Sequence, residues 1–152
     1  MKVEIINSEY LTVFLNKCYF DEIDLEKKSD IIACIKDIIS KIDSRYRLNL
    51  NGFYKIKVFP NKKLGVYLDI IKIDDNDFND RADFRIVIYQ DSNFYLEMDV
   101  CDIKNIDEKI YYNNNFYINI NDINNIDKYM DYGQIIYGDR AKEIEYYGKK
   151  LK

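Results

Sequence analysis

The sequence predicts an α+β fold made of two small modules, each an antiparallel sheet covered by helices. Three observations lead to this prediction. Apolar residues alternate with polar ones in several short runs, which is typical of half-buried strands. One longer run instead repeats its apolar residues at helical spacing. An aspartate-rich stretch separates two such patterns, at residues 1–73 and 84–152, and 152 residues are enough for two small domains.

In the first half, the run MKVEIINSEYLTVFLN predicts a β-hairpin, because apolar residues alternate on both sides of the turn-forming NSE. A helix is predicted over SDIIACIKDIISKIDSRY, with Ser29 as its N-cap and Asp30 in its first turn. The run FYKIKVFPNKKLGVYLDIIKI predicts a second hairpin that turns at PNKK. The apolar stripe of the helix, which should cover this sheet, consists of Ile31, Cys34, Ile35, Ile38, Ile39 and Ile42.

Residues 84–152 contain a second pattern. DFRIVIYQ predicts a strand, and EKIYYNNNFYINI predicts a hairpin with its turn at residues 113–115. NDINNIDKYMDYGQ and DRAKEIEYYGKK predict two short helices, which stop at Gly133 and Gly148. In residues 92–103 the apolar spacing fits a strand as well as a helix, so periodicity alone leaves both open.

The stretch KIDDNDFNDRADF holds five aspartates and could be a cation-binding loop or a tether between the modules. An EF-hand loop that began at Asp75 would need glycine at its sixth position and glutamate at its twelfth, but Asp80 and Ile86 stand there. Residues 74–83 also contain no aliphatic residue except Ala82. We therefore predict that residues 74–83 are an acidic linker and form no specific metal site.

The composition argues against catalysis and against nucleic-acid binding. The chain has no histidine, no glycine-rich phosphate-binding motif and three cysteines without C-x-x-C spacing. We therefore predict no enzyme activity, no catalytic residues and no cofactor. Residues 74–152 hold 10 Lys and Arg against 17 Asp and Glu, whereas residues 1–73 hold 13 against 10. The acidic second half disfavours a phosphate backbone as partner.

The sequence shows no apolar run of 18 residues and no secretion leader, so it predicts neither a membrane segment nor export. Three scattered cysteines are typical of reduced thiols, which predicts a cytoplasmic protein. An acidic second half in that setting fits a protein partner with a basic surface.

A protein-binding surface is the functional prediction that remains. The segments KYMDYGQIIYG and EIEYYGKK combine tyrosines with acidic neighbours, a composition that is enriched at interfaces. The same tyrosines could instead pack on the sheet, and the sequence leaves both interpretations open. The candidate partner-binding residues flank the two glycines: Asp131, Tyr132, Gln134, Glu145 and Tyr147.

The order of these motifs resembles that of the bacterial MecA adaptor proteins. MKVEIINSEYLTVFL is similar to the opening strands of that family, and FYKIKVFPNKKLGVYLDIIK is similar to its next hairpin. IYYNNNFYINI is similar to its aromatic strand-turn-strand, and MDYGQ and EYYGKKL are similar to its paired C-terminal EYG motifs. The linker is shorter than is usual in the family, which indicates a divergent, short member.

The resemblance implies a non-enzymatic adaptor that tethers protein substrates to a ClpC-type AAA+ unfoldase. Residues 1–73 would hold the substrate, and residues 84–152 would engage the unfoldase. Tethering would raise the local concentration of substrate at the unfoldase. Two other functions stay open: a regulator or inhibitor that binds one target without an unfoldase, and a module that binds a small ligand between helix and sheet.

Overall fold

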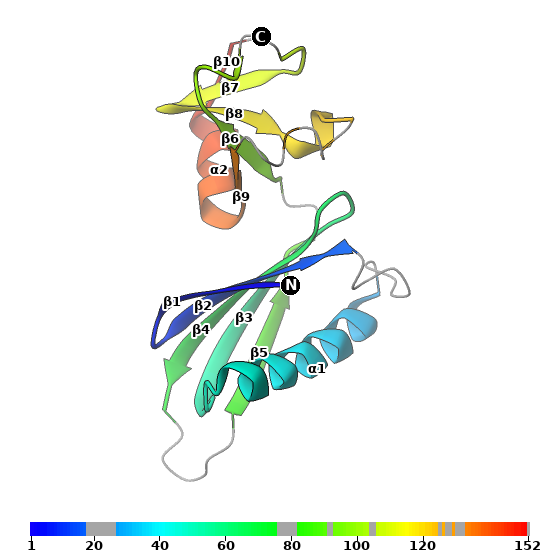
Figure 1. Ribbon diagram of the computed structural model, residues 1–152, viewed down its shortest axis with the longest axis vertical. Helices are drawn as coiled ribbons and strands as arrows, with labels where there is room; N and C mark the ends of the chain where they lie inside the picture. Colours follow the sequence, from blue (N-terminus) through cyan, green and yellow to red (C-terminus); the bar gives the residue numbers. More distant parts are fainter. Residues whose placement is uncertain are drawn as a thin grey trace. The chain divides into compact units, whose positions relative to one another are not determined.

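The chain divides into two compact units, residues 1–90 and 91–152. Within the described residues each unit contains one five-stranded sheet and one α-helix, which confirms the predicted mixture of strands and helices (Figure 1). The computed structural model describes residues 1–17, 27–75, 82–90, 93–103, 106–124, 126, 129 and 133–151.

The first unit is built on a sheet with strand order β1-β2-β4-β3-β5. Strand β5 runs parallel to β3, and the other neighbouring pairs are antiparallel. Both hairpins predicted for this half are confirmed, as β1-β2 and β3-β4. The elements are β1 (Lys2–Asn7), β2 (Tyr10–Asn16), α1 (Lys28–Tyr46), β3 (Gly52–Asn61), β4 (Gly65–Asp74) and β5 (Ala82–Ile88).

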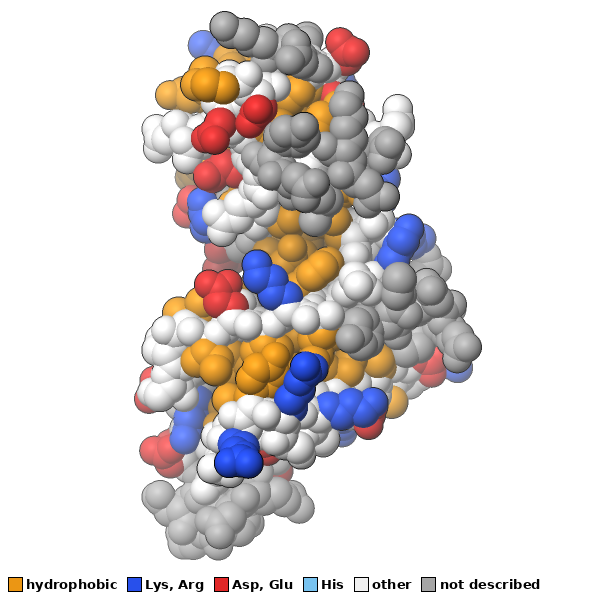
Figure 2. Space-filling model, in the orientation of Figure 1, with side chains coloured by type: hydrophobic (Ala, Val, Ile, Leu, Met, Phe, Trp, Pro, Cys, Tyr) orange, Lys and Arg blue, Asp and Glu red, His pale blue; other side chains and the backbone are white. Residues whose placement is uncertain are grey.

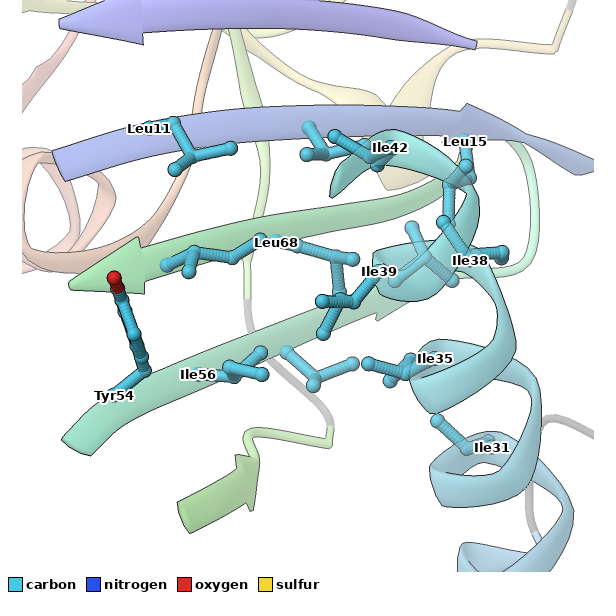
Figure 3. Close-up of a cluster of buried hydrophobic side chains, with 14 residues drawn as sticks. Leu11, Leu15, Ile31, Ile35, Ile38, Ile39, Ile42, Tyr54, Ile56 and Leu68 are labelled. Carbon is cyan, nitrogen blue, oxygen red and sulfur yellow. The ribbon is translucent and has the colours of Figure 1, made fainter. Parts of the chain in front are cut away.

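Helix α1 packs on one face of this sheet because its isoleucines recur every three or four residues. Figure 3 shows these isoleucines pointing from the helix toward side chains on the strands, such as Leu11, Ile56 and Leu68. The predicted N-cap at Ser29 is wrong, since the helix begins at Lys28. The predicted stripe is confirmed: Ile31, Ile35, Ile38, Ile39 and Ile42 are buried, and Cys34 packs beside them half-buried.

Strand β5 corrects the predicted boundary between the two halves. It pairs with β3 over seven residues, from Gly52 opposite Ala82 to Val58 opposite Ile88. Its apolar side chains Phe84, Ile86 and Ile88 pack against the core under α1. The predicted start of the second module at residue 84 is therefore wrong, since the first unit extends to Gln90. The prediction that the first sheet is antiparallel throughout is also wrong, because β5 runs parallel to β3.

The acidic stretch at residues 74–83 joins two strands of the same sheet, β4 and β5, so it does not separate the two units. Its first residues are held locally, because the Lys72 ammonium lies 2.7 Å from an Asp75 carboxylate oxygen. Asp77 and Asp80 lie outside the described residues, and the absence of a metal site there stays a prediction.

The turn between β3 and β4 is held by a buried asparagine. The side-chain oxygen of Asn61 accepts hydrogen bonds from the backbone N–H of Lys63 at 2.9 Å and of Leu64 at 3.1 Å. Gly65 then has a φ of 130°, and a Cβ there would collide with the carbonyl oxygen of Leu15 on β2. Only glycine combines this backbone angle with so close a neighbouring strand.

The second unit has an antiparallel sheet with strand order β10-β7-β8-β6-β9. The predicted hairpin turn is confirmed, and its central residue Asn114 has a φ of 64°. The elements are β6 (Tyr95–Met98), β7 (Ile110–Asn113), β8 (Asn115–Asn119), the 3-10 turn η3 (Ile120–Asp122), β9 (Gly133–Ile136), α2 (Gly138–Tyr147) and β10 (Lys149–Lys150).

Strand pairing defines two features of this unit. Residues 95–98, left open by the sequence, form strand β6, which pairs with β8 on one side and with β9 on the other. The residues directly before Gly133 lie outside the described residues, so the helix expected there stays a prediction. Gly133 itself begins β9, where it lies so close to the carbonyl of Glu97 that a Cβ would collide with it. The predicted stop of α2 at Gly148 is confirmed.

Candidate partner-binding surface

Helix α2 is anchored to its sheet by only two buried side chains. Ala141 and Ile144 are one helical turn apart and pack against Tyr95, Tyr117 and Ile136. The helix ends where the backbone N–H of Gly148 donates to the carbonyl of Ile144 at 2.8 Å. Side chains on the remaining faces of this short helix therefore face solvent.

The end of α2 carries two neighbouring tyrosines, Tyr146 and Tyr147, whose side chains are each 78% exposed. The chain then returns to the sheet, because Lys149 pairs with Tyr112 of β7 and the N–H of Leu151 donates to the carbonyl of Ile110 at 2.8 Å. Tyr112 and Leu151 are exposed as well. We define the carboxyl-terminal surface as the exposed residues at the end of α2, which are Glu145, Tyr146 and Tyr147.

The structure places some of the predicted partner-binding residues on this surface. Glu145 and Tyr147 are exposed near the end of α2. Gln134 is also exposed, but it lies in β9, at the edge of the sheet opposite to β10. Asp131 and Tyr132 lie outside the described residues, so their part in the surface stays a prediction.

Tyr146 is as exposed as its neighbour Tyr147, but it is not among the residues predicted from the sequence. The pair YY in EIEYYG is the signal that identifies it, because the prediction names only the tyrosine directly before the glycine. Ala141 and Ile144 define the side of α2 that packs on the sheet. Tyr146 is two residues after Ile144, so it lies on another face of the helix.

The second unit carries the whole net charge of the chain. Residues 91–152 contain 8 Lys and Arg against 12 Asp and Glu, and residues 1–90 contain 15 of each. The imbalance is smaller than the one predicted for residues 74–152, because the acidic stretch and β5 belong to the first unit. Figure 2 shows acidic and hydrophobic side chains close together on the second unit.

A polar depression of about 230 Å³ lies beside α2 and is distinct from the exposed tyrosines. Next to it, the Arg140 guanidinium lies 3.5 Å from the Glu97 carboxylate. Burial, with the Glu97 carboxylate as the next cause, raises the pKa of Tyr117. Small-ligand pockets are usually larger than about 300 Å³ and mainly apolar, so this depression does not favour the small-ligand module. Its lining residues are Asn113, Asn114, Asn115, Tyr117, Arg140, Glu143 and Ile144.

The described residues show no grouping of three or more cysteine or acidic side chains that could hold a metal ion. Cys34 and Cys101 are both free thiols, and burial, followed by the nearby Asp37, raises the pKa of Cys34. A raised pKa makes a thiol a weaker nucleophile at neutral pH. In the part of the chain that the structure describes, no helix is both long enough and apolar enough to span a membrane.

Comparisons with protein-family models, curated proteins and solved structures found no match for this chain. The resemblance to the MecA adaptors therefore rests on the order of the quoted motifs. Three of them are hairpins in the structure, and EYYGKKL ends a helix. MDYGQ differs, since its glycine begins strand β9.

Proposed function

We propose that the protein is a non-enzymatic adaptor that binds a partner protein through the carboxyl-terminal surface of its second unit. The observation that carries this proposal is the exposure of Tyr146 and Tyr147, each 78%, at the end of a helix whose other side is buried. A tyrosine ring offers a large apolar area with few rotatable bonds, and such rings are enriched among the residues that dominate binding energy. Two adjacent exposed rings supply a contact that the unit does not use for its own core.

The partner class that the resemblance supplies is a ClpC-type AAA+ unfoldase, with a protein substrate held by the first unit. In this arrangement the two units are separate binding modules, and the adaptor works by keeping the substrate near the unfoldase. The acidic balance of the second unit supports a partner with a basic docking surface. Affinity should then fall as salt rises, mainly because the association rate falls.

The test is binding of the full chain to a ClpC-type unfoldase, with Tyr146→Ala and Tyr147→Ala as variants. We expect at least one variant to lose on the order of 2 kcal/mol of binding free energy, about thirtyfold in affinity, because a central aromatic contact is removed. Tyr46→Ala is the matched control, since Tyr46 is an exposed tyrosine at the end of the helix in the other unit. Equal affinity for all four proteins would remove the carboxyl-terminal surface from the proposal.

A regulator that binds one target without an unfoldase is the second candidate. It uses the same exposed tyrosines, and it is favoured by the two departures from the expected order of elements, β5 in the first sheet and Gly133 in a strand. Stimulation of the unfoldase ATPase by the full chain separates the two functions. An adaptor that assembles the unfoldase should stimulate it, and the Tyr146 and Tyr147 variants should do so less; a single-target regulator should leave the ATPase unchanged.

A further inference from the structure

Strand β1 forms one edge of the first sheet and pairs with β2 alone among the described strands. Its pairing is regular from Lys2 to Ile5 and shifts between Ile5 and Asn7, so the regular part presents backbone N–H and C=O groups on the outer side as a template for another strand. Ile5 and Ile6 are 54% and 49% exposed. A partner strand added along this edge would cover apolar surface as well as complete the backbone hydrogen bonds.

The charges on β1 alternate in sign along one face of the strand. Lys2 pairs with Phe14 and Glu4 pairs with Thr12, so both charged side chains lie on the same face of the sheet. Val3 lies between them and packs into the core under α1, which places Lys2 and Glu4 on the face away from the helix. Both are exposed. Charges at a sheet edge usually block pairing, but opposite charges two residues apart can select one pairing register.

Two-fold symmetry restricts the registers that two copies of β1 can adopt. A symmetric antiparallel pair is centred on a residue that lies opposite its own copy. Centring on Lys2 or on Glu4 brings two like charges face to face. Centring on Val3 places Lys2 of each copy opposite Glu4 of the other, which forms two cross-strand ion pairs on one face.

We propose that two copies of this chain associate through β1, antiparallel and centred on Val3, so that their first sheets become one continuous sheet. The second copy is the occupant that the charge pattern fits, because the pattern is complementary to itself only in this register. The α1 helices of the two copies then lie on the same side of the joined sheet. Such a dimer also carries two copies of the carboxyl-terminal surface, although the pairing itself is independent of the proposed function.

The experiment measures the dissociation constant of the full chain by sedimentation equilibrium for wild type, Lys2→Glu and Glu4→Lys. Each single variant puts like charges opposite each other twice, so we expect dimerisation to weaken on the order of tenfold to a hundredfold. Mixing the two single variants restores both unlike pairs, and so does combining both changes in one chain. The mixture and the double variant should therefore dimerise as wild type does.

The control is Lys36→Glu, which makes the same charge change at an exposed position of α1 and should leave dimerisation unchanged. Circular dichroism checks that the variants fold, which is expected because Lys2 and Glu4 are exposed. A wild-type chain that stays monomeric at about 0.5 mM would overturn the proposal. The register, and with it the assignment of this edge, would be overturned by either of two results. One is a dissociation constant that the charge changes leave unaltered, and the other is a mixture of the two single variants that does not dimerise.

Discussion

Among the described residues, each unit has a five-stranded sheet and one α-helix, but the two helices pack against different kinds of side chain. In the first unit the 19-residue helix α1 buries five isoleucines against aliphatic strand residues. In the second, the ten-residue helix α2 buries only Ala141 and Ile144, and these face the rings of Tyr95 and Tyr117. Aliphatic side chains can be buried on all sides, whereas a tyrosine brings a hydroxyl that needs a polar partner or water.

This difference explains where each unit offers a surface for binding. The stripe of α1 is wide enough to hold the whole helix on its sheet, so most of its hydrophobic side chains are used in the core. The short contact of α2 leaves the end of the helix outside the core, and Tyr146 and Tyr147 are exposed as a result. Exposed aromatic side chains occur in both units, but the two most exposed ones, Tyr146 and Tyr147, lie on the helix with the smaller contact.

The largest effect that separates the two cores is expected from Ile35→Ala compared with Ile144→Ala. Ile35 is fully buried between α1 and the sheet, so its truncation should leave a cavity and lower the free energy of unfolding by about 3–5 kcal/mol. Ile144 lies beside tyrosine rings near a helix end, where neighbours can close part of the space, so about 2–3 kcal/mol is expected.

Denaturant-dependent hydrogen exchange, measured amide by amide, assigns each loss to its unit. Ile35→Val is the control and should cost about 1 kcal/mol, since only one methylene group is removed. An equal or greater loss in the second unit would contradict the comparison, because it would show that α2 is packed on its sheet as tightly as α1 is.

The second expected effect is a loss of stability in alkaline solution. Burial, followed by the Glu145 carboxylate, raises the pKa of Tyr95 from 10.0 to about 12. The folded state therefore holds the phenol proton more tightly than the unfolded state. The contribution is present in full below pH 10 and is lost as pH rises from 10 to 12, with a slope of about 1.4 kcal/mol per pH unit at most.

Urea unfolding of wild type and Tyr95→Phe across this pH range measures the contribution of this one group. The phenylalanine keeps the ring that packs edge-on against Tyr111 but has no proton to lose. We expect a shallower pH slope for the variant in the transition of the second unit. The first unit should keep its own slope, because its tyrosines with pKa values of about 12, Tyr10 and Tyr67, are unchanged. Identical slopes for both proteins would show that Tyr95 reaches solvent.

The smallest expected effect concerns the turn of the β7-β8 hairpin. Asn114 has a φ of 64°, a left-handed conformation that glycine adopts without steric cost. Asn114→Gly should raise the stability of the second unit by about 0.5 kcal/mol, although added freedom in the unfolded chain offsets part of the gain. Thermal unfolding checks the sign. A clear loss of stability would show that the asparagine side chain stabilises the turn by more than the backbone strain costs.

Local signals in the sequence were sufficient for much of the first unit. The alternation of apolar residues predicted both of its hairpins, and the isoleucine spacing predicted which side of α1 is buried. In the second unit the asparagine-rich turn and the stop of α2 at Gly148 were also predicted. Each of these features depends on residues that are close together in the chain, where propensity and spacing act directly.

The candidate site was predicted only in part. Glu145 and Tyr147 were selected from their position beside a glycine and are exposed, but Tyr146 was missed and Gln134 lies on the opposite edge of the sheet. The sequence could not distinguish tyrosines that pack from those that face solvent, because both kinds occur in the same acidic surroundings. Tyr95 is buried beside Ala141 and Ile144 of α2, whereas Tyr146 belongs to α2 itself and is exposed.

The sequence by itself determined the local elements: the hairpins, the apolar side of α1 and the absence of histidine chemistry. Only the tertiary structure decided that β5 joins the first sheet, that residues 95–98 are a strand and that Gly133 begins another. The physical reason is that a strand is stabilised by neighbours that are distant in the chain. An alternating pattern shows that a segment can pair, but the choice of partner depends on which competing strand and face bury the most apolar surface.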